Sequence, residues 1–217
     1  MTGRMEQTIF AYATPRGLAI VSNVVALSVC LSACASSAPL ARLWEYPAGA
    51  GGVVAVDEST AGQQYSFDDI TLCLTTKGEV DVTSVVPIDA TGGLEVHNFG
   101  VLPANTGGAI NYIEDPSASL SEAGFDLRNP SAVAAVCPDL ATGDVGGGLY
   151  ILGISVSRTD LDVGTARGFR VSYLSGGGEY SADYPLGVAL CRELHTPSGD
   201  INPECDVHPI TMPSSEE

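Results

Sequence analysis

The sequence predicts a mainly β protein, an antiparallel β-sandwich with a long irregular insertion and little helix. Three observations support this prediction: short segments of alternating apolar and polar residues, glycine-rich turns between them, and an even set of four cysteines beyond residue 34. Alternation of this kind is the period of a strand with one buried face. About 180 residues follow the N-terminal leader, enough for one domain with a sizeable core.

Residues 1–34 have the three parts of a secretory signal. Arg4 and Arg16 supply a basic flank, residues 17–31 form a short apolar run, and small residues follow it. A permanent membrane helix usually needs about 20 consecutive apolar residues, more than this run provides. We therefore expect a leader that directs export.

The leader ends in Leu31-Ser32-Ala33-Cys34, which resembles the lipobox of bacterial lipoproteins. The resemblance covers residues 17–34 only, and it implies cleavage before Cys34 and attachment of a diacylglycerol to its sulfur. The two acyl chains of that group, such as palmitate, are enough to anchor a protein stably at a membrane, where one chain would be marginal. The competing interpretation is ordinary secretion, with Ala33-Cys34-Ala35 as the cleavage motif and a product that starts at Ser36. The lipoprotein interpretation predicts a protein anchored to the cell membrane and facing away from the cytoplasm.

The part of the chain that follows the leader is strongly acidic. The sequence has 26 acidic and 9 basic residues, and only Glu6, Arg4 and Arg16 precede Cys34, so the net charge beyond it is close to −18. Such a surface repels nucleic acid and anionic headgroups and keeps a domain soluble. We expect no nucleic-acid partner, and a solvated acidic coat accounts for the charge without a function.

The predicted organisation has four parts: a signal peptide at 1–33, a tether at 34–42, a sandwich domain at 43–195 and an irregular tail at 196–217. Strands are expected at residues 53–56, 65–75, 80–86, 94–99, 149–158, 168–173 and 186–191. We expect 65–75 and 80–86 to form a hairpin, and 94–99 to extend it into an antiparallel meander. Beyond Cys205 the tail is expected to be frayed.

Residues 102–138 interrupt the strand pattern with prolines and glycines. Short helices are conceivable only at 117–124 and 131–136. A loop of this length in a compact domain is either functional or wrongly assigned, so it is the first place to look for a binding surface. The aromatic residues expected to contact a ligand from loops are Tyr112, Phe125 and Tyr180.

Four cysteines remain after the leader, and in an exported chain they predict two disulfides. Pairing of Cys191 with Cys205 and of Cys73 with Cys137 is slightly favoured, because the first pair is the most local. Pairing of Cys73 with Cys191 and of Cys137 with Cys205 is equally good if the strands that hold Cys73 and Cys191 are neighbours.

Six to eight short strands with two disulfides resemble an immunoglobulin-like sandwich. The resemblance concerns architecture alone. Antibody-type domains have a tryptophan between their two disulfide-bonded cysteines, whereas Trp44 precedes all four of the cysteines that remain here.

No motif predicts a metal or cofactor. Cys191 and Cys205 with His195 and His208 form a zinc-like set, but export favours a disulfide. Asp160-x-Asp162-x-Gly164 matches part of a calcium loop and lacks the later ligands, so a turn with solvated acids explains it better. The remaining polar residues that stand out have ordinary explanations: Asp68-Asp69 and Glu114-Asp115 as charged loop faces, and His97 as an outward strand residue.

No catalytic residue is predicted either. Ser155 and Ser157 lie in a strand pattern rather than in a nucleophile elbow, and the chain has a single lysine, Lys77. The leading hypothesis is a non-catalytic lipoprotein, anchored through Cys34, that acts as an interaction or structural module of the cell envelope with an envelope protein or glycan as partner. Two alternatives are a binding module for carbohydrate or a small ligand, and an envelope hydrolase whose carboxylates meet only in space.

Overall fold

The computed structural model describes residues 40–47, 50–104, 113, 115–125, 127, 132–138 and 148–212. The leader, Cys34 and Tyr112 therefore lie outside the described residues. Within the described part the chain forms strands and turns and no α-helix, which confirms the mainly β prediction. The strands are β1 (Gly52–Val56), β2 (Tyr65–Leu72), β3 (Val80–Ile88), β4 (Glu95–Ala104), β5 (Ala132–Val133), β6 (Leu149–Ser157), β7 (Val163–Ala166), β8 (Gly168–Ser175), β9 (Gly178–Tyr184) and β10 (Leu186–Cys191).

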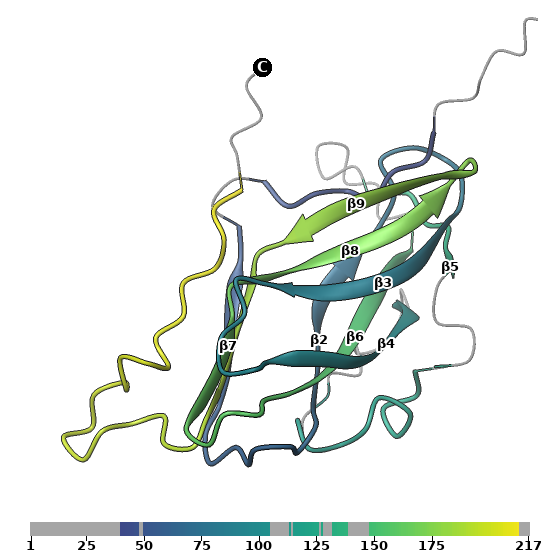
Figure 1. Ribbon diagram of the computed structural model, residues 1–217. Coiled ribbons are helices and arrows are strands. Elements are labelled where there is room, and N and C mark those ends of the chain that lie inside the picture. The colour runs from purple at the N-terminus through teal and green to yellow at the C-terminus, as the bar shows by residue number, and fades with distance from the viewer. Residues whose placement is uncertain are drawn as a thin grey trace, which may run out of the picture. The chain divides into compact units, whose positions relative to one another are not determined.

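These strands form three sheets, in the orders β1–β10–β7, β2–β6–β4 and β5–β3–β8–β9 (Figure 1). Every neighbouring pair is antiparallel except β1 and β10, which run parallel. All three sheets contribute to one hydrophobic core, because alternate residues of each strand face it. Phe169, Leu152 and Val188, one from each sheet, are fully buried there.

Two segments of the chain pass directly from one sheet into another. β7 and β8 are separated only by Arg167, and β9 and β10 only by Pro185. β8 and β9 form a hairpin whose turn, Gly176-Gly177, has positive φ at both residues, a conformation that glycine adopts without strain. The expected strands 168–173 and 186–191 are present, and β9 is an additional strand between them.

The predicted hairpin and meander are wrong. β2 pairs with β6, β3 pairs with β8 and β5, and β4 pairs with β6, so these consecutive strands never pair with one another. The turns at 76–79 and 89–93 carry the chain between sheets instead of reversing it within one. Glycine-rich turns indicate a change of direction, but they do not determine which strand becomes the partner.

The insertion also differs from the prediction. Residues 117–124 form turns rather than a helix, and Ala132–Val133 is strand β5 where a short helix was expected at 131–136. Leu120 and Phe125 pack on Ile151 in a second, smaller hydrophobic cluster. A Cβ atom at Gly153 of β6 would approach both Leu120 and Phe125 to 2.8 Å, so glycine at this position allows the close packing. The insertion therefore covers the outer face of the β2–β6–β4 sheet.

The C-terminal segment is irregular, as expected, but it is not frayed beyond Cys205. Val207 and Met212 are buried against the domain. The Ile210 N–H donates to the Arg167 carbonyl oxygen (2.8 Å), and the Arg167 Nε–H donates to the His208 carbonyl oxygen (2.9 Å). Figure 1 shows this segment in yellow along one side of the domain. Residues 213–217 lie outside the described part.

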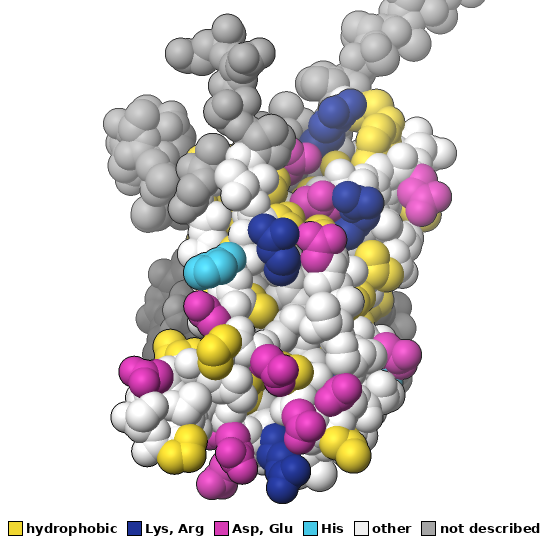
Figure 2. All heavy atoms as spheres, turned by 60° about the vertical axis from the view of Figure 1, so that its left-hand side comes forward, with side chains coloured by type: hydrophobic (Ala, Val, Ile, Leu, Met, Phe, Trp, Pro, Cys, Tyr) yellow, Lys and Arg dark blue, Asp and Glu magenta, His cyan; other side chains and the backbone are white. Residues whose placement is uncertain are grey.

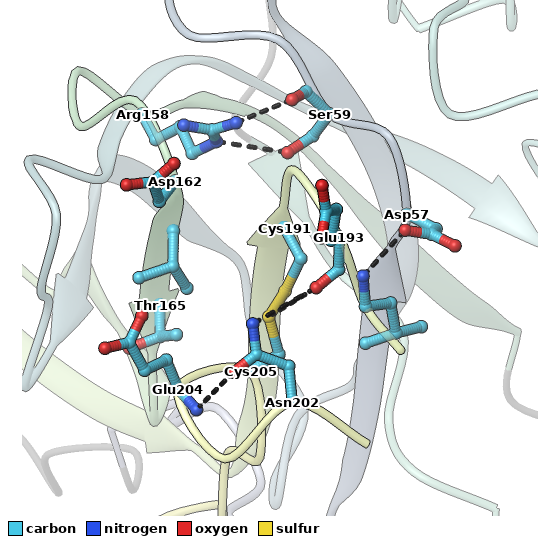
Figure 3. The surroundings of a disulfide bond; sticks show 12 residues. Asp57, Ser59, Arg158, Asp162, Thr165, Cys191, Glu193, Asn202, Glu204 and Cys205 are labelled. Atoms are coloured by element: carbon cyan, nitrogen blue, oxygen red, sulfur yellow. Dashed lines mark hydrogen bonds between the residues drawn. A yellow bond between two sulfur atoms is a disulfide. The ribbon is translucent and has the colours of Figure 1, made fainter. Parts of the chain in front are cut away.

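Two disulfides are present, Cys73–Cys137 and Cys191–Cys205. This is the slightly favoured pairing, and it leaves neither Cys191 nor Cys205 as a zinc ligand. Cys73 follows β2, and its disulfide fixes the segment after β5 beside it. Figure 3 shows Cys205 brought to the end of β10, where the Asn202 side chain donates to the Glu193 carbonyl oxygen (3.2 Å).

Removal of the two disulfides should have unequal effects on stability. The cysteines are 64 residues apart in Cys73–Cys137 and 14 apart in Cys191–Cys205. We expect Cys73→Ala/Cys137→Ala to lower the free energy of unfolding by about 4 kcal/mol, and Cys191→Ala/Cys205→Ala by about 3 kcal/mol, because the longer loop constrains the unfolded chain more. Urea unfolding without reductant measures both; a larger loss for the shorter loop contradicts the prediction.

Candidate binding cleft

A cleft opens between the edge strands of two sheets. Ten residues line it, namely Tyr46, Gly51, Gly52, Val53, Val54, Asp69, Ile70, Tyr184, Pro185 and Leu186. Its volume is about 270 Å³, room for a large side chain or a small ligand rather than for an extended polymer. Gly51–Val54 belong to the edge strand β1 and the residue before it, and Asp69 and Ile70 belong to the edge strand β2. We call this feature the β1–β2 cleft.

Aromatic side chains form one wall of the β1–β2 cleft. The Tyr46 ring lies 5.2 Å from the Trp44 ring and 5.6 Å from the Tyr184 ring, the latter edge to face. Tyr184 is 1% exposed, and its hydroxyl donates to the Trp44 carbonyl oxygen (3.2 Å). Burial raises the pKa of the Tyr184 hydroxyl, so this group stays protonated. Trp44, 36% exposed, extends the aromatic surface towards solvent.

Segment 42–46 is held beside β2 by hydrogen bonds that replace a regular strand. The Trp44 N–H donates to the Cys73 carbonyl oxygen (2.8 Å), and the Thr75 N–H donates to the Arg42 carbonyl oxygen (2.8 Å). Further along, the Tyr46 hydroxyl accepts from the Thr71 N–H (3.3 Å). The Tyr46 hydroxyl thus accepts the bond that a backbone carbonyl would accept in a regular pair of strands. Segment 42–46 separates from β2 at this point, and the cleft begins there.

Asp68 and Asp69 lie at a bulge within β2, so their assignment as a charged loop face is wrong. Asp68 is 6% exposed and accepts from the Ile113 N–H (3.1 Å), whereas Asp69 is exposed at the mouth of the β1–β2 cleft. Loss of hydration raises the pKa of both carboxyl groups, and the neighbouring Asp69 charge adds to the shift at Asp68. The bulge directs the two carboxylates into different surroundings.

The aromatic residues predicted to contact a ligand do not meet at one site. Phe125 is 4% exposed and belongs to the small cluster under the insertion, so it offers no stacking surface. Tyr180 lies in β9 rather than on a loop; its ring stacks on Tyr173 at 5.9 Å and lies 5.3 Å from the Arg42 guanidinium carbon. Tyr112 lies outside the described residues.

A second group of polar residues surrounds the Cys191–Cys205 disulfide (Figure 3). Arg158 is buried; its guanidinium donates to the Ser59 hydroxyl (3.1 Å), the Ser59 carbonyl (2.6 Å) and the Asp160 carbonyl. The Asp57 carboxylate accepts from the Leu194 N–H (2.7 Å), which lowers the pKa of Asp57. The Arg158 bonds tie the loop after β1 to the end of β6, and the Asp57 bond ties the same loop to the segment after β10, so these bonds serve the fold.

The metal-like motifs do not form metal sites in the described part of the chain, where no three His, Cys, Asp or Glu side chains cluster suitably. The Asp160 carboxylate accepts from the Asp162 and Val163 N–H groups in a turn, and the Asp162 bond is the main reason why its pKa is lowered. Exposed His97 forms a hydrogen bond with the Ser157 hydroxyl (2.7 Å). Acidic side chains gather at the lower end of the face in Figure 2.

The sequence pattern missed Tyr46, Tyr184 and Asp69. An aspartate pair inside an apolar, alternating segment was the available signal for Asp69, because a charged pair in a strand indicates a bulge or a site. Nothing in the sequence joins Tyr46 to Tyr184, which are 138 positions apart and meet only through the fold.

No family model, characterised protein or solved structure matches this chain. Among the residues that the structure describes, no helix has the length and apolar character needed to cross a membrane.

Burial of Asp68 should be visible as a pH-dependent difference in stability. Its folded-state pKa is raised, so its favourable contribution is complete below the unfolded pKa of about 3.9 and is lost as the pH rises through the folded value. We expect Asp68→Asn to match the parent in stability near pH 3 and to exceed it at pH 7. Urea unfolding at the two pH values measures the difference.

Asp57→Asn is the control of opposite sign. The pKa of Asp57 is lowered, so its contribution is present above about pH 3.9 and lost as the pH falls. This variant should be less stable than the parent at pH 7 and approach it at pH 3. If the stability difference from the parent changes with pH in the same direction in both variants, the opposite pKa shifts of Asp68 and Asp57 are wrong.

Proposed function

We propose that this protein is a non-catalytic interaction module of the cell envelope, exported and anchored to the membrane through a lipid on Cys34. The observation that supports export is the state of the four cysteines after Cys34, all of which are joined in disulfides. Disulfides persist in oxidising compartments and are rare in the cytosol. The leader and the lipobox-like Leu31-Ser32-Ala33-Cys34 agree with that compartment.

We further propose that the domain is an immunoglobulin-like antiparallel sandwich, with the β2–β6–β4 and β5–β3–β8–β9 sheets as its two layers. Their shared core supports this: Leu72, Ile154 and Val101 from one sheet cluster with Val82 and Val171 from the other. The β1–β10–β7 sheet then continues from the second layer, because β7 leads directly into β8 and β9 leads directly into β10.

A binding role is favoured by the β1–β2 cleft. The cleft combines aromatic walls, an apolar floor and one carboxylate, a composition that suits binding through side-chain contacts. Only six positions separate Cys34 from Leu40, so an anchor on Cys34 holds the domain close to the membrane. A partner would therefore be another component of the envelope.

A carbohydrate or small ligand is the second candidate, because Trp44 and Tyr46 form an aromatic surface at the β1–β2 cleft, with Tyr46 packed against buried Tyr184. Aromatic faces pack against apolar ligand faces while tyrosine hydroxyls bind polar groups.

Lipid attachment can be tested directly. In cells supplied with labelled palmitate, we expect the parent protein to incorporate label and to fractionate with membranes, whereas Cys34→Ala should do neither. Intact mass with and without reductant reports the start residue, the lipid and the two disulfides together. Unlabelled parent protein that starts at Ser36 supports ordinary secretion, and reduced, uncleaved protein in the cytosol contradicts export altogether.

Sugar binding at the β1–β2 cleft should change the fluorescence of Trp44, the only tryptophan of the chain. For a panel of envelope mono- and disaccharides, the second candidate predicts a saturable change that Tyr46→Ala weakens at least about tenfold. Phe125→Leu, which alters the buried cluster under the insertion and does not line the cleft, serves as control and should bind as the parent does. A flat response to the whole panel removes this candidate.

A further inference from the structure

We propose that the β1–β2 cleft takes an extended peptide that adds to the free edge of β1 as a further strand. One large apolar or aromatic side chain of the peptide enters the cleft, and a basic residue lies beside Asp69. The inference rests on the interaction role proposed above and specifies the class of partner.

The backbone of β1 provides the first argument. The Gly52 N–H donates to the Pro185 carbonyl oxygen (3.2 Å), so Gly52, Val54 and Val56 direct their backbone groups towards β10. Because these directions alternate along a strand, Val53 and Ala55 direct their N–H and C=O groups to the opposite edge. Within the described residues no strand pairs with that edge.

The composition of this edge is the second argument. Proteins usually protect an open edge with lysine, proline or an inward charge, because unpaired backbone groups are a template for another strand. β1 reads Gly-Val-Val-Ala-Val and carries none of these. Val53 is 48% exposed and Ala55 is also exposed, so neither side chain is covered by the domain.

Two glycines at the cleft provide the third argument, because they differ in what the fold requires. A Cβ atom at Gly51 would approach the Pro185 carbonyl oxygen to 2.6 Å, and the Gly51 φ is +154°, so the fold itself excludes a larger residue there. At Gly52 the nearest atom to such a Cβ is Leu186 Cδ1, at 3.9 Å, an ordinary contact. Packing within the described residues therefore does not account for Gly52, and the missing side chain leaves this part of the cleft open.

Charge decides between a peptide and a second copy of this chain. The chain carries a net charge of −17, and Asp69 is exposed at the mouth of the β1–β2 cleft. Two such chains repel each other, whereas a basic peptide is attracted and steered towards the cleft. Strand addition supplies main-chain hydrogen bonds, and pockets beside the edge select alternate side chains. Tyr46, Tyr184 and Ile70 provide such a pocket.

The test is a calorimetric titration of the full chain, purified in detergent, with a synthetic peptide. The probe is an acetylated and amidated peptide of about seven residues, valine alternating with lysine around a central tyrosine, which spans the five residues of β1. Its control has the same side chains and a methyl group on every backbone nitrogen, so neither of its edges can pair with β1. We expect saturable binding of the probe and at least about tenfold weaker binding of the control.

Three variants locate the binding. Val53→Pro removes the outward N–H without removing a bond to β10, and Gly52→Leu fills the cleft; each should weaken binding at least about tenfold. Asp69→Asn should weaken it severalfold and reduce its dependence on salt. Val86→Thr, at an exposed valine of β3 that does not line the cleft, should bind as the parent does. Thermal melting reports whether each variant is folded. Gly52→Leu and Val53→Pro test the cleft and the strand edge separately, so either one suffices if the other does not fold.

Three results would overturn the inference: no binding by the folded parent, equal binding by parent and both folded β1 variants, or equal binding of the N-methylated control. A parent that dimerises, with dimerisation lost in Val53→Pro, assigns the edge to a second copy and also overturns it. A saccharide that binds while the peptide does not has the same effect. None of these results changes palmitate incorporation at Cys34, so failure of the inference is distinguishable from failure of the proposed function.

Discussion

The change of sheet at Pro185 is the constraint on which the arrangement of the domain depends. Proline has no N–H group, so the ladder between β8 and β9 ends with Tyr184 opposite Phe169, and β10 begins a new ladder with β7. The Pro185 carbonyl oxygen accepts from Gly52 and thereby sets where β1 joins β10. The β1–β2 cleft lies at this bend, with Tyr184 and Leu186 on either side of Pro185.

The outer faces of the β2–β6–β4 and β1–β10–β7 sheets are covered in part by chain segments without regular structure. Leu120 and Phe125 of the insertion lie over β6, and Val207 of the C-terminal segment lies over β10 beside Gly187. In each case a glycine in the strand allows the close approach. The segments that look most like loops in the sequence therefore contribute to burial, while one edge of the short apolar strand β1 has no partner strand among the described residues.

The sequence predicted the strands well and their partners poorly. Alternation at Ile70, Leu72 and Leu74 reports one buried face, and the structure confirms that all three are buried. The partner of β2 is β6, about 80 positions away, and no local pattern encodes that choice. The disulfide pairing was open for the same reason, since it depends on which strand ends are neighbours.

The candidate site was beyond the reach of the sequence for a related reason. Tyr46 and Tyr184 are conspicuous only once the bend brings them together, whereas Tyr112, Phe125 and Tyr180 stood out because they lie near glycines and prolines. Asp68 and Asp69 were assigned to a loop because charged pairs are usually solvated. A bulge in β2 accommodates them within a strand, which only the pairing register reveals.

All six residues of β10 are buried, an unusual property for a strand whose sheet has only three members. Its inner face contacts the core, and its outer face is closed by Val207 and the Cys191–Cys205 disulfide. Solvent can reach its amides only after the C-terminal segment detaches or the whole domain opens. Deuterium uptake at β10 would therefore report detachment of the C-terminal segment or opening of the whole domain, while uptake at the outward amides of Val53 and Ala55 would be among the fastest in the domain.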